Sequence, residues 1–141
     1  MRANYLSKIA VLLLLVNQLA MAEKPLAPES LDGITRVSAE DAVDLIVKTP
    51  NLIIVDSRKD IEYSKGHIQG SISLLDTNMT PDMLASHVPD KATPVLFYCN
   101  GERCLRSSRA AIRALEWGYE RIYWFRGGWS EWVKKGMPIS H

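Results

Sequence analysis

The sequence has few cysteines, and both stand on one short stretch of chain. Its 141 residues include two cysteines, Cys99 and Cys104, and three histidines. A zinc site built on this pair would need further ligands, but His87 and His141 lie in unrelated parts of the chain. We therefore expect neither a metal nor a cofactor. The remaining explanations of the pair are a disulfide and a reactive thiol.

A strong excess of one charge is also lacking. The chain has 17 basic and 16 acidic residues, and loss of Arg2 and Lys8 with a leader segment would leave 15 basic residues. This near-neutral balance removes the electrostatic basis for binding nucleic acid. The charge is nevertheless uneven, because six arginines and only two acidic residues lie between residues 103 and 126. The cluster favours a local site for a small anion over a surface for a polyanion.

The sequence has no apolar run long enough to be an ordinary membrane span. The run at residues 9–16 follows basic residues and is interrupted by Asn17, whereas a span needs about 20 apolar residues. Small residues complete an A-x-A pattern at residues 20–22. We therefore expect residues 1–22 to be a signal peptide that is cleaved after export to the periplasm, with a retained N-terminal anchor as the alternative. The protein would then meet the membrane only through this segment, and it would work in an oxidising compartment.

Strand-like and helix-like segments alternate along the rest of the chain. Two continuous apolar runs, at residues 52–56 and 94–98, are typical of strands buried on both faces of a sheet. Helix-starting signals stand at Ser38 and at Thr80 with Pro81. The alternation predicts one α/β domain at residues 34–141, with a mainly parallel sheet flanked by helices. Residues 23–33 show little pattern of their own, and we name them the lead-in segment.

The further elements follow from the same signals. We expect strands near residues 35–37, 72–74 and 121–125, a short helix ending at Gly66, and helices at about 107–117 and 129–135.

The two cysteines stand where such a fold places ligands. Loops at the carboxyl ends of parallel strands, together with the N-termini of the helices that follow, form concavities that bind anions. Cys99 directly follows the predicted strand, so its thiolate would be stabilised by loop N–H groups and by Arg103 or Arg106. We expect Gly101 to supply the backbone freedom for this turn. Cys99 is the better candidate for a nucleophile, because Cys104 lies at the far lip of the loop.

Three motifs resemble the signatures of the rhodanese-like domain family. "VDSRKDIEYSKGHIQGSISL" (55–74) is similar to the first signature, "FYCNGERCLRSSRAA" (97–111) to the active-site loop, and "GGWSEWVKKGMP" (127–138) to the C-terminal ending. The similarity covers nearly all of residues 34–138. It implies the three-layer rhodanese-like fold and a sulfurtransferase that carries a persulfide on the loop cysteine, here Cys99.

The resemblance also implies roles for individual residues. The sulfur would come from a small anionic donor such as thiosulfate and pass to cyanide or to a thiol protein of the periplasm. Residues of the loop would hold the donor: Asn100, Gly101, Glu102, Arg103, Cys104, Leu105 and Arg106. Four residues of the first signature would support the site: Asp56 and Arg58 as an ion pair, Glu62 in the same network, and His67 in a structural role.

The loop departs from the family pattern. The usual loop has a basic residue five positions after the cysteine, but Cys104 occupies that position here, and the loop is about two residues longer. Counting from Cys104 instead places Arg109 at the usual spacing, which keeps Cys104 as the alternative nucleophile. Cys104 itself either works with Cys99, by attacking the outer or inner sulfur of its persulfide or by closing a reversible disulfide with it, or is a bystander thiol that faces the protein. The donor preference is left open by this altered loop.

Other functions on this fold fit the loop less well. A phosphatase would have an arginine six positions after the cysteine, and Leu105 stands there. A dithiol–disulfide redox protein using Cys99 and Cys104 is the main alternative to sulfur transfer. A binding module without activity would have no reason to keep Cys99.

Overall fold

A five-stranded parallel sheet forms the centre of the molecule. The computed structural model describes residues 23–141, so the predicted signal peptide lies outside the described residues. The strand order is β1-β6-β5-β2-β4, and every neighbouring pair is parallel. The strands are β1 (Thr35–Arg36), β2 (Ile53–Asp56), β4 (Ile72–Ser73), β5 (Val95–Tyr98) and β6 (Ile122–Phe125). Within residues 23–141, no helix combines the length and the apolar character that crossing a bilayer requires.

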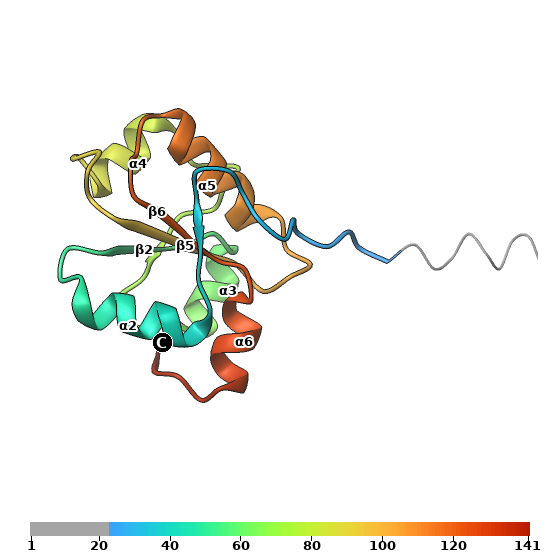
Figure 1. Cartoon of the computed structure of the whole chain (residues 1–141). Helices are drawn as coiled ribbons and strands as arrows, with labels where there is room; N and C mark the ends of the chain where they lie inside the picture. The colour runs from blue at the N-terminus through green and yellow to red at the C-terminus, as the bar shows by residue number, and fades with distance from the viewer. Residues whose placement is uncertain (1–22) are drawn as a thin grey trace, which may run out of the picture.

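Helices cover both faces of this sheet, as Figure 1 shows. α4 and α5 lie on one face, and α2 and α6 lie on the other. The helices are α2 (Ala39–Lys48), α3 (Asp60–Lys65), α4 (Pro81–His87), α5 (Arg106–Glu116) and α6 (Gly128–Lys134). The predicted three-layer α/β fold with a mainly parallel sheet is therefore confirmed.

Local sequence signals explain where two of these helices begin. The Ser38 hydroxyl accepts a hydrogen bond from the Asp41 N–H at 3.1 Å, and the Asp41 carboxylate accepts one from the Ser38 N–H at 3.1 Å. The Thr80 hydroxyl caps α4, and Pro81 occupies its first turn, where no N–H is needed. Both predicted helix starts are confirmed.

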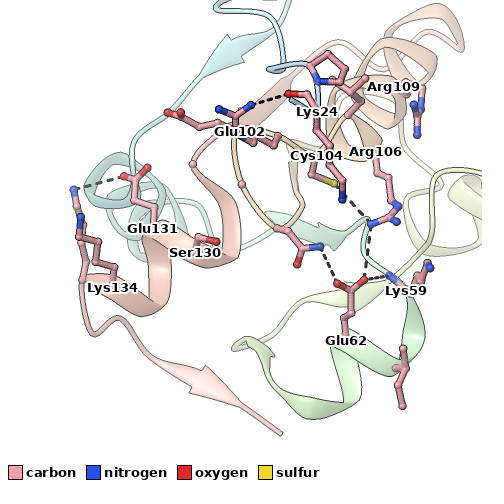
Figure 2. Close-up of a pocket in the computed structure, with 18 residues that line it drawn as sticks. Lys24, Lys59, Glu62, Glu102, Cys104, Arg106, Arg109, Ser130, Glu131 and Lys134 are labelled. Carbon is pink, nitrogen blue, oxygen red and sulfur yellow. Dashed lines mark hydrogen bonds and ion pairs between the residues drawn. The ribbon is translucent and has the colours of Figure 1, made fainter. Parts of the chain in front are cut away.

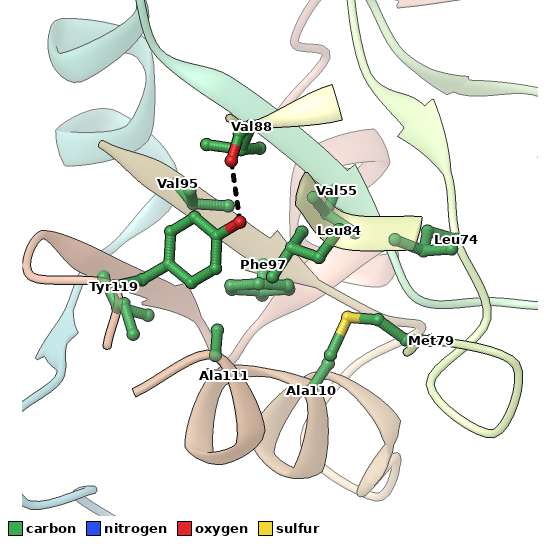
Figure 3. Close-up of a cluster of buried hydrophobic side chains, with 12 residues drawn as sticks. Val55, Leu74, Met79, Leu84, Val88, Val95, Phe97, Ala110, Ala111 and Tyr119 are labelled. Carbon is green, nitrogen blue, oxygen red and sulfur yellow. Dashed lines mark hydrogen bonds between the residues drawn. The ribbon is translucent and has the colours of Figure 1, made fainter. Parts of the chain in front are cut away.

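The core consists of one apolar cluster on each face of the sheet. All four residues of β5 are buried, and they alternate between the two clusters. Figure 3 shows the cluster under α4 and α5, in which Phe97 packs beside small residues such as Ala110 and Ala111 of α5. These short side chains let α5 approach the sheet closely. Because α5 begins directly after the loop that holds both cysteines, this packing fixes one end of the loop.

Two features of the fold lie outside the sequence-based expectation. A second, antiparallel sheet joins β3 (His67–Ile68) to β7 (Ile139–Ser140). Local patterns do not predict this pairing, because His67 and its partner Ser140 are far apart in the chain. The lead-in segment packs on the domain, and its Ala27 is only 3% exposed. The buried Arg126 at the end of β6 holds this segment by donating hydrogen bonds to the carbonyl oxygens of Ala27 and Pro28, both at 2.9 Å.

Candidate active site

The loop at residues 99–105 lies at the carboxyl end of β5, the central strand of the sheet. It connects β5 to α5, and Leu105 forms the N-cap of that helix. In parallel sheets this edge is where ligands bind. Cys99 is the first residue of the loop and is 1% exposed, whereas Cys104 is partly exposed. The structure therefore places Cys99 at the base of the loop and Cys104 at its rim.

Cys99 and Cys104 are joined by a disulfide. Their Cα atoms are 6.2 Å apart, within the usual range for a bridged pair. A turn hydrogen bond from the Cys104 N–H to the Gly101 carbonyl oxygen, at 3.0 Å, folds the loop back on itself. The alternative in which Cys104 is an unpaired bystander is therefore wrong.

Glu62 of α3 contacts both ends of the loop. The Asn100 side-chain amide donates a hydrogen bond to the Glu62 carboxylate at 2.8 Å, and a second Glu62 oxygen lies 3.8 Å from Nη1 of Arg106. Partial burial by itself would raise the pKa of Glu62, but hydrogen bonds from Asn100 and from the Lys59 N–H, with the charges of Arg106 and Arg58, lower it overall. Glu62 is therefore an anion that braces both ends of the loop.

Glu102 and Arg103 of the loop contact the lead-in segment and Arg126. The Glu102 carbonyl oxygen accepts a hydrogen bond from the Ala27 N–H at 2.6 Å, and the Glu102 carboxylate lies 2.9 Å from Nη1 of Arg126. Arg103 donates a hydrogen bond to the Lys24 carbonyl oxygen at 2.7 Å. Glu102 and Arg103 thus serve the packing of the lead-in segment. Arg106, which also lines the groove over the loop, makes no hydrogen bond or ion pair with the lead-in segment among residues 23–141.

The glycine on which this site depends is Gly128, not Gly101. The expectation that Gly101 supplies the backbone freedom is wrong, because its φ is not positive and a Cβ there would meet only ordinary contacts. Gly128, at the start of α6, has a φ of +56°, and a Cβ on it would collide with the carbonyl oxygen of Cys99. This close approach allows the Trp129 N–H to donate to the Cys99 carbonyl oxygen at 2.8 Å and the Ser130 N–H to donate to the Asn100 carbonyl oxygen at 2.9 Å. The pair Gly127 and Gly128 at the start of the C-terminal motif is the feature of the sequence that could have predicted this contact.

Several N–H groups of the loop are free to bind an anion. Within residues 23–141, the N–H groups of residues 100–103 have no hydrogen-bond acceptor. The loop carbonyl oxygens at Cys99, Asn100, Gly101 and Glu102 all accept hydrogen bonds from the protein. A loop with satisfied carbonyl groups and free N–H groups favours negative charge at its centre.

A buried ion pair supports the base of the site. Arg58 and Asp56, at the end of β2, are joined by a 2.7 Å contact from Nη2 to Oδ2, and both side chains are almost fully buried. Arg58 also donates to the Gly66 carbonyl oxygen at 2.7 Å, which fixes the end of α3. The Tyr98 hydroxyl donates to Asp56 at 2.6 Å. Burial and the neighbouring Asp56 charge raise the pKa of Tyr98, so the phenol stays a proton donor.

The His67 ring packs on Tyr63 of α3. The two rings are stacked with a centroid distance of 3.7 Å, and the His67 Nδ1 lies 3.0 Å from the Tyr63 carbonyl oxygen. The Tyr63 hydroxyl donates to the carbonyl oxygen of Ser71 at 2.7 Å. These contacts join α3, β3 and the start of β4. They give His67 a place in the scaffold.

A wide groove of about 1230 Å³ opens over the loop (Figure 2). Of the two cysteines, only Cys104 lines it. The lining has seven basic residues, Lys24, Lys59, Arg103, Arg106, Arg109, Lys134 and Lys135, against three acidic residues, Glu62, Glu102 and Glu131. The surplus of positive charge favours an anionic ligand. The lysines and Arg109 were not among the predicted site residues, because they stand outside the loop and the first motif or beside its named positions, and only the fold gathers them at the groove.

Comparison with known proteins places the chain in a family. The rhodanese-like domain family matches residues 38–135. A tRNA uridine(34) hydroxylase from Yersinia pestis is 28% identical over 110 residues, and one from Hamiltonella defensa is 30% identical over 107 residues. These matches cover 71% and 69% of this chain, but only 30% and 29% of the relatives.

Solved structures share the fold. A thiosulfate sulfurtransferase from Pseudomonas aeruginosa has a TM-score of 0.61 and 25% identity, covering 77% of this chain and 20% of that protein. A protein from Bacillus halodurans has a TM-score of 0.67 and 23% identity, covering 75% and 76%. A polysulfide-sulfur transferase from Wolinella succinogenes has a TM-score of 0.61 and 23% identity, covering 77% and 79%. With the family match over residues 38–135 and this shared fold, the chain belongs to the rhodanese-like domain family.

Proposed function

We propose that the chain is a sulfurtransferase that carries sulfane sulfur as a persulfide on Cys99. The observation that carries the proposal is the position of Cys99 at the carboxyl end of the central strand, beside a loop whose N–H groups at residues 100–103 have no acceptor within residues 23–141. Membership of the rhodanese-like family and the likeness to a thiosulfate sulfurtransferase support the same reaction class.

The reaction begins from the reduced form of the pair. The Cys99 thiolate attacks the sulfane sulfur of a donor such as thiosulfate, the S–S bond of the donor breaks, and sulfite leaves with the electron pair. The persulfide anion is stabilised by the N–H dipoles of the loop. Arg106, whose side chain is 27% exposed and faces the groove, binds the anionic end of the donor. A thiophilic acceptor, cyanide or a protein thiol, then removes the terminal sulfur.

A thiosulfate:cyanide assay on the reduced protein tests this proposal. Cys99→Ser should abolish turnover, because an alcohol is a far weaker nucleophile than a thiolate at neutral pH. Arg106→Ala should raise the KM for thiosulfate about tenfold through the loss of a charged contact. Arg121→Ala is the matched control, since Arg121 is exposed, lies outside the groove and should leave the KM unchanged. Full turnover by Cys99→Ser would refute the proposal and assign the nucleophile to Cys104.

The disulfide favours a second candidate function, dithiol–disulfide exchange. Cys104 is partly exposed and bonded to Cys99, as expected of a redox pair. The two functions differ in one product. Sulfur transfer releases sulfite from thiosulfate, whereas disulfide exchange alone does not. Sulfite release by the reduced protein therefore separates them.

We also propose that the protein is exported to the periplasm, with residues 1–22 as a cleaved signal peptide. The supporting features are the basic start, the short apolar run and the A-x-A end of this segment. A disulfide between the two cysteines is compatible with an oxidising compartment. N-terminal sequencing of the protein from a periplasmic extract should begin at Glu23. Full-length chain in the membrane fraction would support the anchor instead.

The domain shared with the tRNA uridine(34) hydroxylase relatives does not by itself support their activity in this chain. The chain spans about 30% of the length of those relatives. Its balance of 17 basic and 16 acidic residues also provides no general attraction for a polyanion.

A further inference from the structure

We propose that Cys104 discharges the Cys99 persulfide within the molecule, so that the sulfur leaves as hydrosulfide and the observed disulfide forms. The inference rests on the proposed persulfide on Cys99. It adds a second activity to sulfur transfer, the reduction of sulfane sulfur to sulfide. The substrate class is a thiosulfate-like donor together with a dithiol that restores the pair.

The position of Cys104 determines which sulfur it attacks. The disulfide joins the Sγ atoms of the two cysteines, so Cys104 reaches the inner sulfur of a persulfide on Cys99. The Cα separation of 6.2 Å is set by the turn that closes from the Cys104 N–H to the Gly101 carbonyl oxygen. The loop therefore holds the attacking thiol within bonding range of the inner sulfur.

Arg106 makes Cys104 a better nucleophile. Its Nη1 lies 3.9 Å from the Cys104 Sγ, and Figure 2 shows the two side chains together at the groove. A guanidinium next to a sulfur favours the thiolate over the thiol. Glu62, at 3.8 Å from the same Nη1, orients the arginine and at the same time holds Asn100. The group that binds the anionic donor is thus also the group that prepares Cys104 for attack.

The step balances without an outside oxidant. The Cys104 thiolate attacks the Sγ of Cys99, a new S–S bond forms between the two cysteines, and the bond from Cys99 to the terminal sulfur breaks. The terminal sulfur leaves with the electron pair as hydrosulfide, after taking one proton from solvent. The two thiols are oxidised to the disulfide, and the sulfane sulfur is reduced by two electrons to sulfide.

The unequal exposure of the two cysteines determines which of them an external dithiol attacks when it reduces the disulfide. Cys104 lines the groove, whereas Cys99 is 1% exposed and does not. An external dithiol therefore attacks Cys104, and the Cys99 thiolate leaves into the loop of free N–H groups. The second thiol of the dithiol then releases Cys104. The complete cycle converts thiosulfate and a dithiol into sulfite, hydrosulfide and the oxidised dithiol.

A single turnover without external thiol tests the inference. The protein is reduced with dithiothreitol, freed of it without air, and mixed with an equimolar amount of thiosulfate. Sulfite, hydrosulfide and the intact protein mass are then measured for wild type, Cys104→Ser and Cys104→Ala. Wild type should release one hydrosulfide per sulfite and become about 2 Da lighter than the reduced protein. Both Cys104 variants should release sulfite, become about 32 Da heavier and release no hydrosulfide.

Each other outcome overturns a specific step. If wild type becomes about 32 Da heavier and releases no hydrosulfide, the inference is overturned, while the proposed persulfide on Cys99 still stands. Peptide mapping that finds the added sulfur on Cys104 would overturn attack on the inner sulfur. If no protein releases sulfite, the proposed function fails, and the inference fails with it. Unfolding of the reduced proteins in urea verifies that both Cys104 variants are folded.

Discussion

Removal of the buried cation beneath the site should destabilise the whole domain. Arg58 binds both carboxylate oxygens of Asp56, donates to the Gly66 carbonyl oxygen, and lies 4.5 Å above the centre of the Trp129 ring. It therefore connects the end of β2 with the end of α3 and the start of α6. Arg58→Met retains most of the apolar stem but removes all of these charged contacts.

The expected loss in the free energy of unfolding follows from the groups that would remain around the vacated Arg58 side chain. The Asp56 carboxylate has no exposed surface and would be left without its cation. Breaking a buried pair from one side costs about 3–5 kcal/mol. The Tyr98 hydroxyl and the N–H at position 58 still donate to Asp56, which places the expected loss near the lower end, at about 3 kcal/mol. This loss is a large part of a typical stability of about 5–15 kcal/mol.

Equilibrium unfolding in urea measures the loss at neutral pH. All proteins are kept reduced, so that the disulfide does not differ between variants. Arg36→Met is the matched control, because Arg36 pairs with Glu29 at 2.8 Å on the surface, where both side chains are well exposed. That change should cost less than about 1 kcal/mol.

A double variant supplies the decisive comparison. Asp56→Asn combined with Arg58→Met removes both charges, so it should be more stable than Arg58→Met alone by about 1 kcal/mol or more. A loss of stability in Arg58→Met no larger than that in Arg36→Met would contradict a stabilising role for the buried pair. A double variant that is less stable than Arg58→Met would show that the unpaired Asp56 charge is not the cause of the loss.

Three further changes test contacts around the loop. Gly128→Ala should cost about 1–3 kcal/mol more than Gly136→Ala in urea unfolding, because both glycines have a positive φ but only the first Cβ would collide with Cys99. Glu62→Gln should destabilise the protein most above pH 4.5, the ordinary pKa of a glutamate. Because the pKa of Glu62 is lowered in the folded protein, the difference in unfolding free energy between Glu62→Gln and wild type should shrink as the pH falls through this lowered pKa. Arg126→Met should cost about 2 kcal/mol and speed amide exchange in the lead-in segment.

Each of these predictions has a contradicting result. Equal losses at the two glycines would show that the close approach to Cys99 is not limiting. A Glu62→Gln effect that is constant from acid to neutral pH would exclude a stabilising role for its negative charge. Unchanged amide exchange in the lead-in segment of Arg126→Met would show that other contacts hold this segment.

Short-range signals in the sequence determined most of the fold. The apolar runs at residues 52–56 and 94–98 predicted β2 and β5 because strands buried on both faces need continuous apolar side chains. Ser38 and Thr80 predicted helix starts because capping depends on residues three positions apart. The position of Cys99 directly after a buried strand located the loop at the carboxyl edge of the sheet.

Contacts between distant segments were decided only by the tertiary structure. Nothing local to Arg126 indicates that it holds the lead-in segment. Pro28, which accepts one of its hydrogen bonds, lies 98 residues earlier in the chain. The approach of Gly128 to Cys99 likewise depends on how β6 and α6 return to the end of β5. The sequence left open whether Cys104 pairs with Cys99, and the structure bonds the two cysteines across the turn at Gly101, with their Cα atoms 6.2 Å apart. Such distances depend on the path of the whole chain, whereas capping and strand burial depend on neighbours within a few residues.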